Sequence, residues 1–193
     1  MGVGSGGQSP PVAAAQFAAP GSVRQVTAAG QNGAVRISTK ADYAVRAAVE
    51  LAARGEEERF TKADELARAQ GLPLSFLENI LGELRAAGLV QTRRGAEGGY
   101  RLALPADKIT IADVVRAVEG PLASVRGEPP ERVSYSGAAA PLQEVWIAVR
   151  ASVRSVCERV TLADVARGLL PDHVRELATD PDARTTRVGP AGR

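Results

Sequence analysis

The stretch that decides the fold is residues 61–104, which read TKADELARAQGLPLSFLENILGELRAAGLVQTRRGAEGGYRLAL. Its first part predicts a short helix, because Thr61 and Asp64 match a capping-box pattern. Gly71 is expected to end this helix, and a turn with a proline leads into a second helix. The apolar side chains expected to face inward from the second helix are Phe76, Leu77, Ile80, Leu81 and Leu84. A short helix, a glycine-containing turn and a longer helix are typical of a helix-turn-helix, with bounds of about 62–87.

The outward face of the second helix carries Ser75, Glu78 and Asn79 in its first turns. The N-terminal end of a recognition helix points into the major groove of DNA, so these side chains are candidates for contacting base edges. Ser75 and Glu78 also match a capping box, and Asn79 could simply be hydrated. The same capping pattern recurs at 110–113 and 161–164, where nothing suggests DNA. Capping and base contact therefore both remain open for these residues.

The last part of the stretch, 89–104, predicts a β-hairpin that forms the wing of a winged helix. Two runs rich in strand-forming residues flank a glycine-rich loop, which is permissive enough for a tight turn. Arg93, Arg94 and Arg101 flank the tip, and planar guanidinium groups suit phosphates or a narrow minor groove. An ordinary hydrated hairpin is the alternative. A nucleotide-phosphate loop is disfavoured, because the sequence has neither a GxGxxG motif that opens a helix nor a P-loop lysine.

Upstream of this stretch, residues 38–54 are predicted to form a helix, because apolar residues recur at helical spacing. This helix completes a winged helix-turn-helix domain over 36–104. Residues 1–34 are rich in glycine, alanine and proline, show no periodicity and are predicted to be a disordered N-terminal extension. Because the periodic pattern starts abruptly near Val35, a misassigned start site is a second hypothesis for these residues.

Downstream, residues 105–178 are predicted to hold a linker helix, a variable loop and a long helix, followed by a disordered tail over 179–193. Six apolar residues of the long helix are spaced alternately by four and three, as in a coiled coil. They are Leu142, Trp146, Val149, Val153, Val156 and Val160. So narrow an apolar face favours pairing with a second copy, although a helix of the protomer's own core is the alternative. Two copies on a two-fold axis would suit palindromic DNA with half-sites about 34 to 36 Å apart.

Composition narrows the class of protein without identifying a partner. Of the 193 residues, 45% are hydrophobic, yet no apolar run approaches the length of a membrane span, and a chain with one cysteine is expected in a reducing cytoplasm. The net charge of +2 neither demonstrates nor excludes a nucleic-acid partner. The single cysteine, Cys157, excludes a disulfide framework and zinc sites built from several cysteines. An enzyme is disfavoured, because no nucleophile, base and orienting group occur together and the only histidine, His173, is expected near a helix end.

Over residues 36–170 the chain resembles the Rrf2 family of bacterial regulators. The segments that carry the resemblance are RISTKADYAVRA at 36–47, LPLSFLENIL at 72–81, GLVQTRRGAEGGYRL at 88–102 and ITIADVVRAVEG at 109–120. The resemblance implies a homodimer on a roughly palindromic operator. It also implies that Ser75, Glu78 and Asn79 contact bases and that Arg94 reaches the minor groove.

One departure from that family concerns iron. Members that hold an iron-sulfur cluster carry three cysteines in the loop after the post-wing helix, and the corresponding loop here, 122–141, has none. Cys157 alone cannot replace three thiolates. Asp42 matches a position that ligates the cluster in some relatives, but an isolated carboxylate is a poor site, and Arg46 stands where another relative uses histidine. No metal, cluster or other cofactor is therefore expected.

The sequence as a whole predicts a mainly α protein with a small β-hairpin wing: a winged helix-turn-helix plus a long C-terminal dimerisation helix. The expected function is that of a homodimeric repressor, a sequence-specific regulator of transcription that binds double-stranded DNA. The alternative is a winged-helix module that binds a partner protein without contacting DNA. The loop 122–141 could take a small-molecule or protein effector, or could be a hydrated connector. Cys157 lies beside the apolar face of the long helix, where a redox role and a purely apolar role both remain open.

Overall fold

The structure is a computed structural model that describes Met1, residues 37–55 and residues 59–186. Apart from Met1, the expected N-terminal extension lies outside the described residues, and so does the end of the expected tail, 187–193. The described part of that tail includes a short 3-10 turn at Asp182–Arg184. None of the helices in the described ranges has the length and apolar character that a membrane crossing requires.

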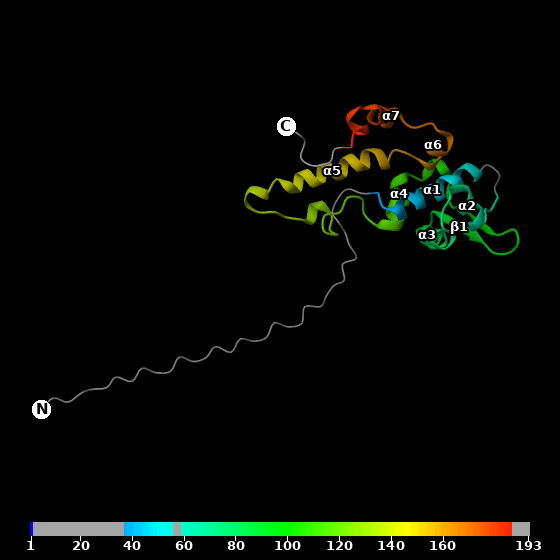
Figure 1. Ribbon diagram of the computed structural model, residues 1–193, viewed down its shortest axis with the longest axis horizontal. Helices are drawn as coiled ribbons and strands as arrows, with labels where there is room; N and C mark the ends of the chain where they lie inside the picture. Colours follow the sequence, from blue (N-terminus) through cyan, green and yellow to red (C-terminus); the bar gives the residue numbers. More distant parts are fainter. Residues whose placement is uncertain (2–36, 56–58, 187–193) are drawn as a thin grey trace. The chain divides into compact units, whose positions relative to one another are not determined.

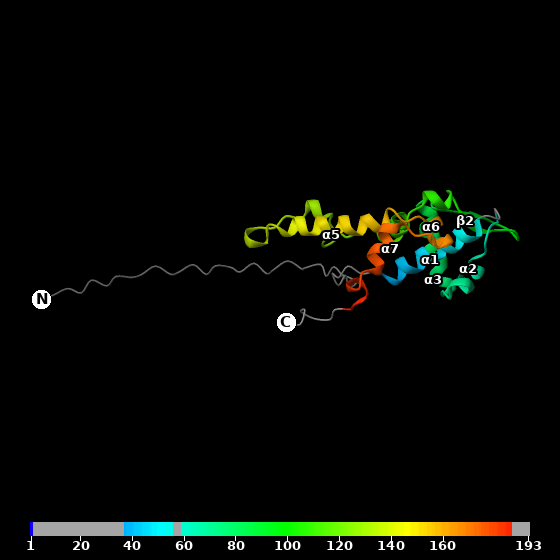
Figure 2. The same ribbon diagram turned by 90° about the horizontal axis from the view of Figure 1, so that it is seen from above.

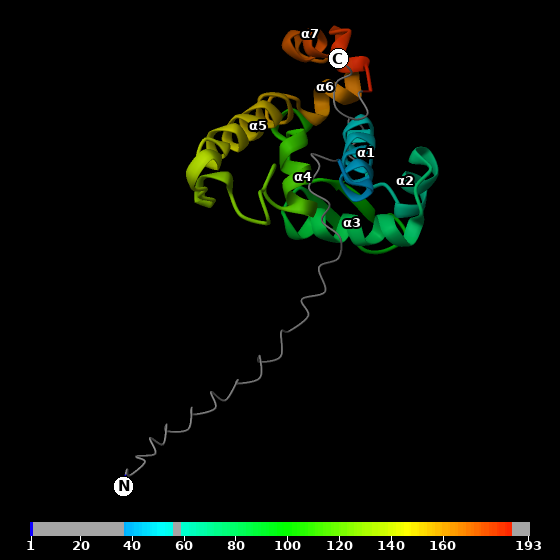
Figure 3. The same cartoon turned by 60° about the vertical axis from the view of Figure 1, so that its left-hand side comes forward.

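Helix α1 (Thr39–Arg54) is the element around which the other N-terminal helices pack (Figures 1 and 3). It begins as predicted, with the Ser38 hydroxyl accepting a hydrogen bond from the Ala41 N–H at 3.0 Å. Its neighbours are α2 (Ala63–Gln70), α3 (Leu74–Ala86), α4 (Ile111–Glu119) and α6 (Leu162–Arg167). The buried side of α1 consists of Ala41, Ala44, Ala47, Ala48 and Leu51. Because four of these five are alanines, neighbouring helices can approach the α1 backbone closely.

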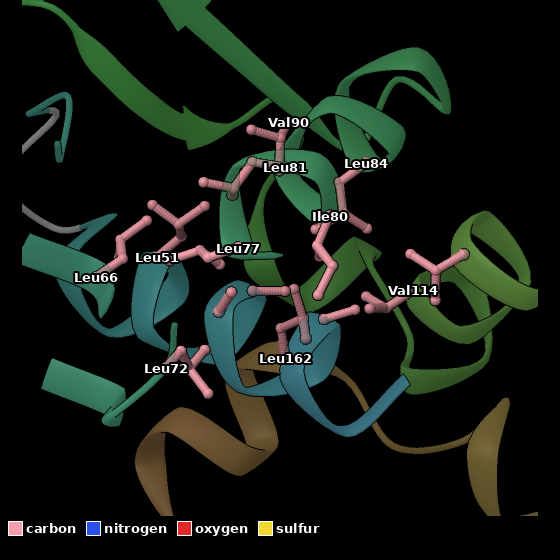
Figure 4. Packing of buried hydrophobic residues seen from close by; sticks show 14 of the residues in the cluster. Leu51, Leu66, Leu72, Leu77, Ile80, Leu81, Leu84, Val90, Val114 and Leu162 are labelled. Atoms are coloured by element: carbon pink, nitrogen blue, oxygen red, sulfur yellow. The ribbon is translucent and has the colours of Figure 1, made fainter. Parts of the chain in front are cut away.

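Aliphatic side chains from these helices meet against α1 and form the hydrophobic core (Figure 4). The core includes Leu51, Leu66, Leu77, Ile80, Leu81, Leu84, Val90, Val114 and Leu162. Burying one such side chain stabilises a fold by about 1.5–3 kcal/mol. Four of these residues come from α3, so the inward face of α3 holds that helix firmly and leaves its other face outward.

The start of α2 differs from the prediction. The helix begins after Lys62, which makes no side-chain capping bond, and Thr61 is buried with only 1% of its surface exposed. The Thr61 backbone pairs with Tyr100, each N–H donating to the other residue's carbonyl oxygen at 2.8 Å. The capping box predicted for Thr61 and Asp64 is wrong, because this pairing places Thr61 in the sheet rather than at the helix end.

The start of α3 also differs from the prediction. The helix begins directly after Pro73, whose carbonyl oxygen accepts a hydrogen bond from the Leu77 N–H at 3.0 Å. Ser75 therefore lies inside the first turn rather than at the N-cap, and no side-chain cap is formed. The capping box considered for Ser75 and Glu78 is not present, because proline with its fixed φ starts the helix earlier.

Other helix ends follow the sequence signals. The capping boxes at Thr110 with Asp113 and at Thr161 with Asp164 are both formed. Gly71 ends α2 with a φ of 63°, in the left-handed region where glycine is favoured. The capping pattern is therefore a reliable signal only where the preceding chain is free to place its hydroxyl at the helix end.

The predicted wing is an antiparallel hairpin of β1 (Val90–Arg93) and β2 (Gly99–Leu102). Gln91 pairs with Arg101 and Arg93 with Gly99, so these four residues share one face of the hairpin. Val90 lies on the opposite face and is buried in the core. The hairpin is thereby attached to the helical domain through one face, while Arg93 and Arg101 lie on the other.

The C-terminal part contains α5 (Leu142–Cys157) and α7 (Asp172–Thr179). Figures 1 and 2 show α5 running past the 121–141 loop and extending away from the helices around α1. The helix ends three residues before Val160, which is buried within the chain and whose carbonyl oxygen accepts a hydrogen bond from the Ile111 N–H at 2.9 Å. The predicted apolar seam is therefore shorter than expected, because the chain leaves the helix at Cys157.

Candidate nucleic-acid interface

The outward face of α3 presents the three polar residues that the sequence singled out. Ser75, Glu78 and Asn79 are all exposed, and they occupy the first two turns of the helix. None of the three makes a side-chain hydrogen bond or ion pair with another described residue. With the capping role removed, their polar groups face solvent and can bind a ligand without breaking a contact of the fold.

Two apolar side chains lie beside this polar face. Leu74 and Phe76 expose 41% and 38% of their surface, whereas Phe76 was expected to face inward. Phe76 instead meets the Tyr43 ring of α1 edge to face, with ring centroids 5.8 Å apart. The expectation for Phe76 is wrong, because the buried face of α3 consists of Leu77, Ile80, Leu81 and Leu84 and does not include Phe76.

A shallow groove of about 550 Å³ runs along α3 next to these residues. Its lining includes Phe76, Asn79 and the Lys40–Glu83 ion pair, which joins α1 to α3 across 2.8 Å. Both side chains of this pair are partly exposed, so the pair contributes little stability by itself. The pair places the Lys40 ammonium beside the polar face of α3, with its charge balanced by Glu83.

Arg93 and Arg101 of the wing are brought together on one aromatic ring. Their guanidinium carbons lie 4.6 and 4.7 Å from the centroid of Phe60. Arg93 also donates from Nε and Nη2 to the carbonyl oxygen of Glu97, at 3.2 and 2.7 Å. The two arginines therefore have defined positions on the wing before any ligand arrives.

Arg94 is placed differently from these two arginines. It follows β1 in the tip loop, is exposed, and makes no hydrogen bond or ion pair with another described residue. The loop around it is narrow, since a Cβ at Gly98 would lie only 2.3 Å from the Arg93 carbonyl oxygen. A compact tip that carries an uncommitted guanidinium group suits entry into a narrow minor groove.

Sequence inspection missed Phe60 and misassigned Thr61. Phe60 is an isolated aromatic residue in a charged segment and belongs to no periodic pattern. Thr61 matched a capping pattern that the fold does not use. The only sequence signal for either residue was the Gly98–Gly99 pair, because a glycine within a strand marks a close approach of another backbone. A Cβ at Gly99 would lie 2.4 Å from the carbonyl oxygen of Thr61.

A polar network holds α2 and the Arg59 segment against α1. Arg54 forms ion pairs with Glu50 at 2.7 Å and with Glu65 at 3.5 Å, and Gln70 donates to Glu50 at 2.7 Å. Burial raises the pKa of Glu50, but the hydrogen bonds from Arg54 and Gln70 outweigh it, so the pKa lies below its ordinary value of 4.5. Glu50 is therefore an ionised link between the first two helices of the domain.

The residues predicted for dimerisation lie on α5 and beyond it. Five of the six, all except Val160, are on α5, where Leu142 is exposed and Trp146, Val149, Val153 and Val156 are partly buried. Val145 and Ile147 nearby expose 47% and 37% of their surface. No residue of α5 is fully buried, so the apolar side of this helix is only partly covered within the chain.

The loop before α5 is fastened to that helix. Gln143 donates to the Glu131 carbonyl oxygen at 3.1 Å, and Arg150 forms an ion pair with the Glu131 carboxylate at 2.5 Å. The hydrogen bond from Arg150 lowers the pKa of Glu131. Residues 130–132 are therefore attached to α5 by a hydrogen bond and an ion pair.

The residues that could ligate a metal do not form a site. Asp42 is paired with Arg46 at 3.5 Å, and the described residues contain no group of three histidine, cysteine, aspartate or glutamate side chains that could hold a metal ion. Burial raises the pKa of the Cys157 thiol. His173 lies in the first turn of α7, as expected, and its Nε2 lies 3.2 Å from the Ser155 carbonyl oxygen.

Comparisons with known proteins agree with this architecture. The family model described as "Rrf2: Iron-dependent Transcriptional regulator" matches residues 37–168. The HTH-type regulator Rv1287 of Mycobacterium tuberculosis is 53% identical over 156 residues, which cover 80% of this chain and 96% of that protein. The HTH-type transcriptional regulator CymR of Bacillus subtilis is 36% identical over 136 residues, which cover 68% of this chain and 90% of that protein.

Solved structures give the same result. The structure of CymR, titled the global cysteine regulator of B. subtilis, covers 70% of this chain and 98% of its own, with a TM-score of 0.60 and 36% identity. The structure of T. potens IscR covers 82% of this chain and 97% of its own, with a TM-score of 0.54 and 30% identity. The iron in the family description does not fit this chain, because its single cysteine and the paired Asp42 cannot supply the donors of a cluster.

Proposed function

The chain belongs to the Rrf2 family of transcriptional regulators, and on that premise we propose that it is a homodimeric repressor that binds a palindromic operator. The observation that carries the proposal is the exposed polar face of α3, where the side chains of Ser75, Glu78 and Asn79 make no hydrogen bond or ion pair with other described residues. The opposite face of the same helix is anchored in the core. A rigid helix with an uncommitted polar face is what base recognition in the major groove requires.

Each polar residue has a chemical preference among the bases. The Glu78 carboxylate accepts a hydrogen bond from the amino group of cytosine, Asn79 can pair with adenine through two bonds, and Ser75 suits several bases. Arg94 enters the adjacent minor groove from the tip of the wing, where its charge is attracted by the narrow groove of A·T-rich DNA. The proposed half-site therefore combines a specific contact in the major groove with a shape-dependent contact in the minor groove.

Dimerisation is proposed to use the apolar side of α5. Leu142 and Val145 are exposed there, and a second copy of the helix would cover them. Pairing about a two-fold axis places two recognition helices about 34 to 36 Å apart, which matches successive major grooves on one side of the duplex. Because the 130–132 segment is attached to α5, an effector bound at the loop 122–141 would act on the dimer helix.

The test is a titration of the purified full chain with duplex DNA from upstream of its own gene, in the range of 50 to 200 mM salt. The logarithm of the affinity is expected to fall linearly with the logarithm of salt concentration, because phosphate contacts release counterions. Arg94→Ala should weaken binding and reduce this slope by about one per protomer. Arg175→Ala, which removes an exposed arginine of α7, is the matched control.

The same titration separates the proposal from the alternative of a protein-binding module. Such a module would bind neither the upstream duplex nor an unrelated duplex at low salt. Light scattering in the absence of DNA checks the dimer, whose expected mass is twice the 20.1 kDa of the chain. A monomer, or a salt slope that is the same for the Arg94→Ala variant and the Arg175→Ala control, would contradict the proposal.

A further inference from the structure

We propose that Phe60 is a positioning residue of the wing, which holds Arg93 and Arg101 and thereby sets the direction in which the tip and Arg94 meet DNA. The inference rests on the proposed function, and it concerns a residue outside the helix-turn-helix and outside the hairpin itself. Its basis is the contact of two like-charged side chains with one aromatic ring. The partner that this arrangement serves is the phosphate backbone and minor groove of DNA.

The geometry explains why both arginines reach the same ring. Arg101 pairs with Gln91 and Arg93 with Gly99, so the two arginines are diagonal neighbours on one face of the hairpin. Their guanidinium carbons lie 4.6 and 4.7 Å from the Phe60 centroid, well within the range of cation–π attraction. Two positive charges placed this close repel each other, and the negative face of the ring offsets that repulsion.

Phe60 is itself held in place by its neighbour. Thr61 is buried, and its backbone makes two hydrogen bonds of 2.8 Å with Tyr100 of β2. Gly99 allows this approach, because a side chain there would collide with the Thr61 carbonyl group. Lys62 then leads directly into α2. Phe60 therefore lies in the segment that leads into α2 and that backbone hydrogen bonds fix to the wing.

The effect of the ring extends to the tip through Arg93. Arg93 donates two hydrogen bonds to the Glu97 carbonyl oxygen, at 3.2 and 2.7 Å, and so closes the loop that contains Arg94. If the ring were removed, Arg93 would regain side-chain freedom and the loop would lose one of its supports. The guanidinium groups that approach the DNA would then have to be ordered during binding, at a cost in affinity.

The experiment compares Phe60→Leu with Phe60→Tyr in the full-length protein. Leucine keeps apolar bulk but has no π face, whereas tyrosine keeps it. Operator affinity should fall about 5- to 30-fold per protomer in Phe60→Leu, which is the combined value of two exposed cation–π contacts. Phe60→Tyr should bind like the wild type. The matched control is Leu177→Ala, which removes exposed apolar bulk from α7 and should leave operator affinity unchanged.

A double-mutant cycle separates positioning from a general loss of structure. If Phe60 acts through both arginines, the effect of Phe60→Leu should fall to about 2- to 5-fold in an Arg93→Ala background, which is the share that remains through Arg101. An equal effect of Phe60→Leu in both backgrounds would overturn the inference, and so would an operator affinity of Phe60→Leu equal to that of the wild type. In either case, operator binding by the wild-type protein leaves the proposed function intact. If the wild type itself ignores the operator, the proposed function is the part that fails.

A second variant covers the case in which Phe60→Leu does not fold. Arg93→Lys keeps the charge but loses the planar group that stacks on the ring and the fork that binds the Glu97 carbonyl. Its operator affinity should fall about 2- to 5-fold, the value of a single exposed cation–π contact. Wild-type affinity of a folded Arg93→Lys protein would overturn the inference.

Discussion

Replacing Gly99 by alanine should detach the wing from the helical domain. Gly99 begins β2 with a φ of 148°, and a Cβ at this position would lie 2.4 Å from the carbonyl oxygen and 2.6 Å from the carbonyl carbon of Thr61. Both are backbone atoms, so no side-chain rotation relieves the collision. The strand and the Thr61 segment would have to separate by roughly 1 Å to reach an ordinary contact distance.

The magnitude follows from the contacts that this separation breaks. The two Thr61–Tyr100 hydrogen bonds, both 2.8 Å, would be lost, at about 0.5–1.5 kcal/mol each. Alanine in this glycine-favouring backbone region adds about 1–3 kcal/mol of strain. Together these terms lower the free energy of unfolding by about 2–6 kcal/mol. For a domain of this size, the melting temperature should fall by roughly 5 to 20 °C.

The assay is thermal unfolding followed by far-ultraviolet circular dichroism, with operator titration of the same samples below the transition. Gly95→Ala is the matched control, because Gly95 also has a positive φ, of 104°, but a Cβ there meets nothing within 4 Å. The control introduces backbone strain alone. Gly99→Ala should therefore have a lower free energy of unfolding than Gly95→Ala, by the free energy of the two lost Thr61–Tyr100 hydrogen bonds. Equal melting temperatures for the two variants would refute the close approach of Gly99 to Thr61.

Three further perturbations test separate parts of the molecule. Glu78→Ala should relax the preference for one base pair in each half-site by about 1–3 kcal/mol, measured by competition between operators that differ at single positions; an unchanged preference profile would remove Glu78 from the interface. Val149→Asp should place a charge on the apolar side of α5 and shift the protein to a monomer in sedimentation. Operator binding should weaken by about 10²- to 10⁴-fold, because the two half-sites would then be bound by two separate monomers instead of one bivalent dimer. Ala151→Asp, on the exposed opposite side of the same helix, should do neither, and a Val149→Asp dimer would contradict the assignment. Glu50 has a pKa below 4.5 in the folded protein, so its ionised form stabilises the fold above that pH and the contribution is lost as the pH falls through the folded pKa. The stability difference between the wild type and Glu50→Gln should therefore shrink in chemical denaturation as the pH is lowered from 6 to 3, whereas a constant difference would argue against the Arg54 and Gln70 contacts.

Much of the fold follows from local patterns in the sequence. The helical periodicity of residues 39–54 and 74–86 is strong, and the glycines at positions 71 and 88 end helices where the backbone turns left-handed. The hairpin is equally local, since two short strands and a glycine-rich tip leave few alternatives. These features depend on neighbours within a few residues, so a single sequence is enough to predict them.

The arrangement of the candidate site is only partly local. Exposure of Ser75, Glu78 and Asn79 follows from helical geometry once the buried positions of α3 are known. Their freedom from capping does not follow, because the capping pattern is present and only the start of α3 at Pro73 removes it. The stacking of Arg93 and Arg101 on Phe60 joins residues more than thirty positions apart, and no periodic signal marks it.

By itself, the sequence determined the helix-turn-helix, the hairpin, the polar residues on the recognition helix and the lack of thiolates for a cluster. The tertiary structure decided which of two competing partners each group takes: Thr61 pairs with a strand instead of capping a helix, and Val160 enters the protomer's core instead of extending α5. It also decided that the wing arginines are held on Phe60. The physical reason is that capping, strand pairing and burial have similar free energies at a single residue, so the distant chain that arrives next to it selects among them.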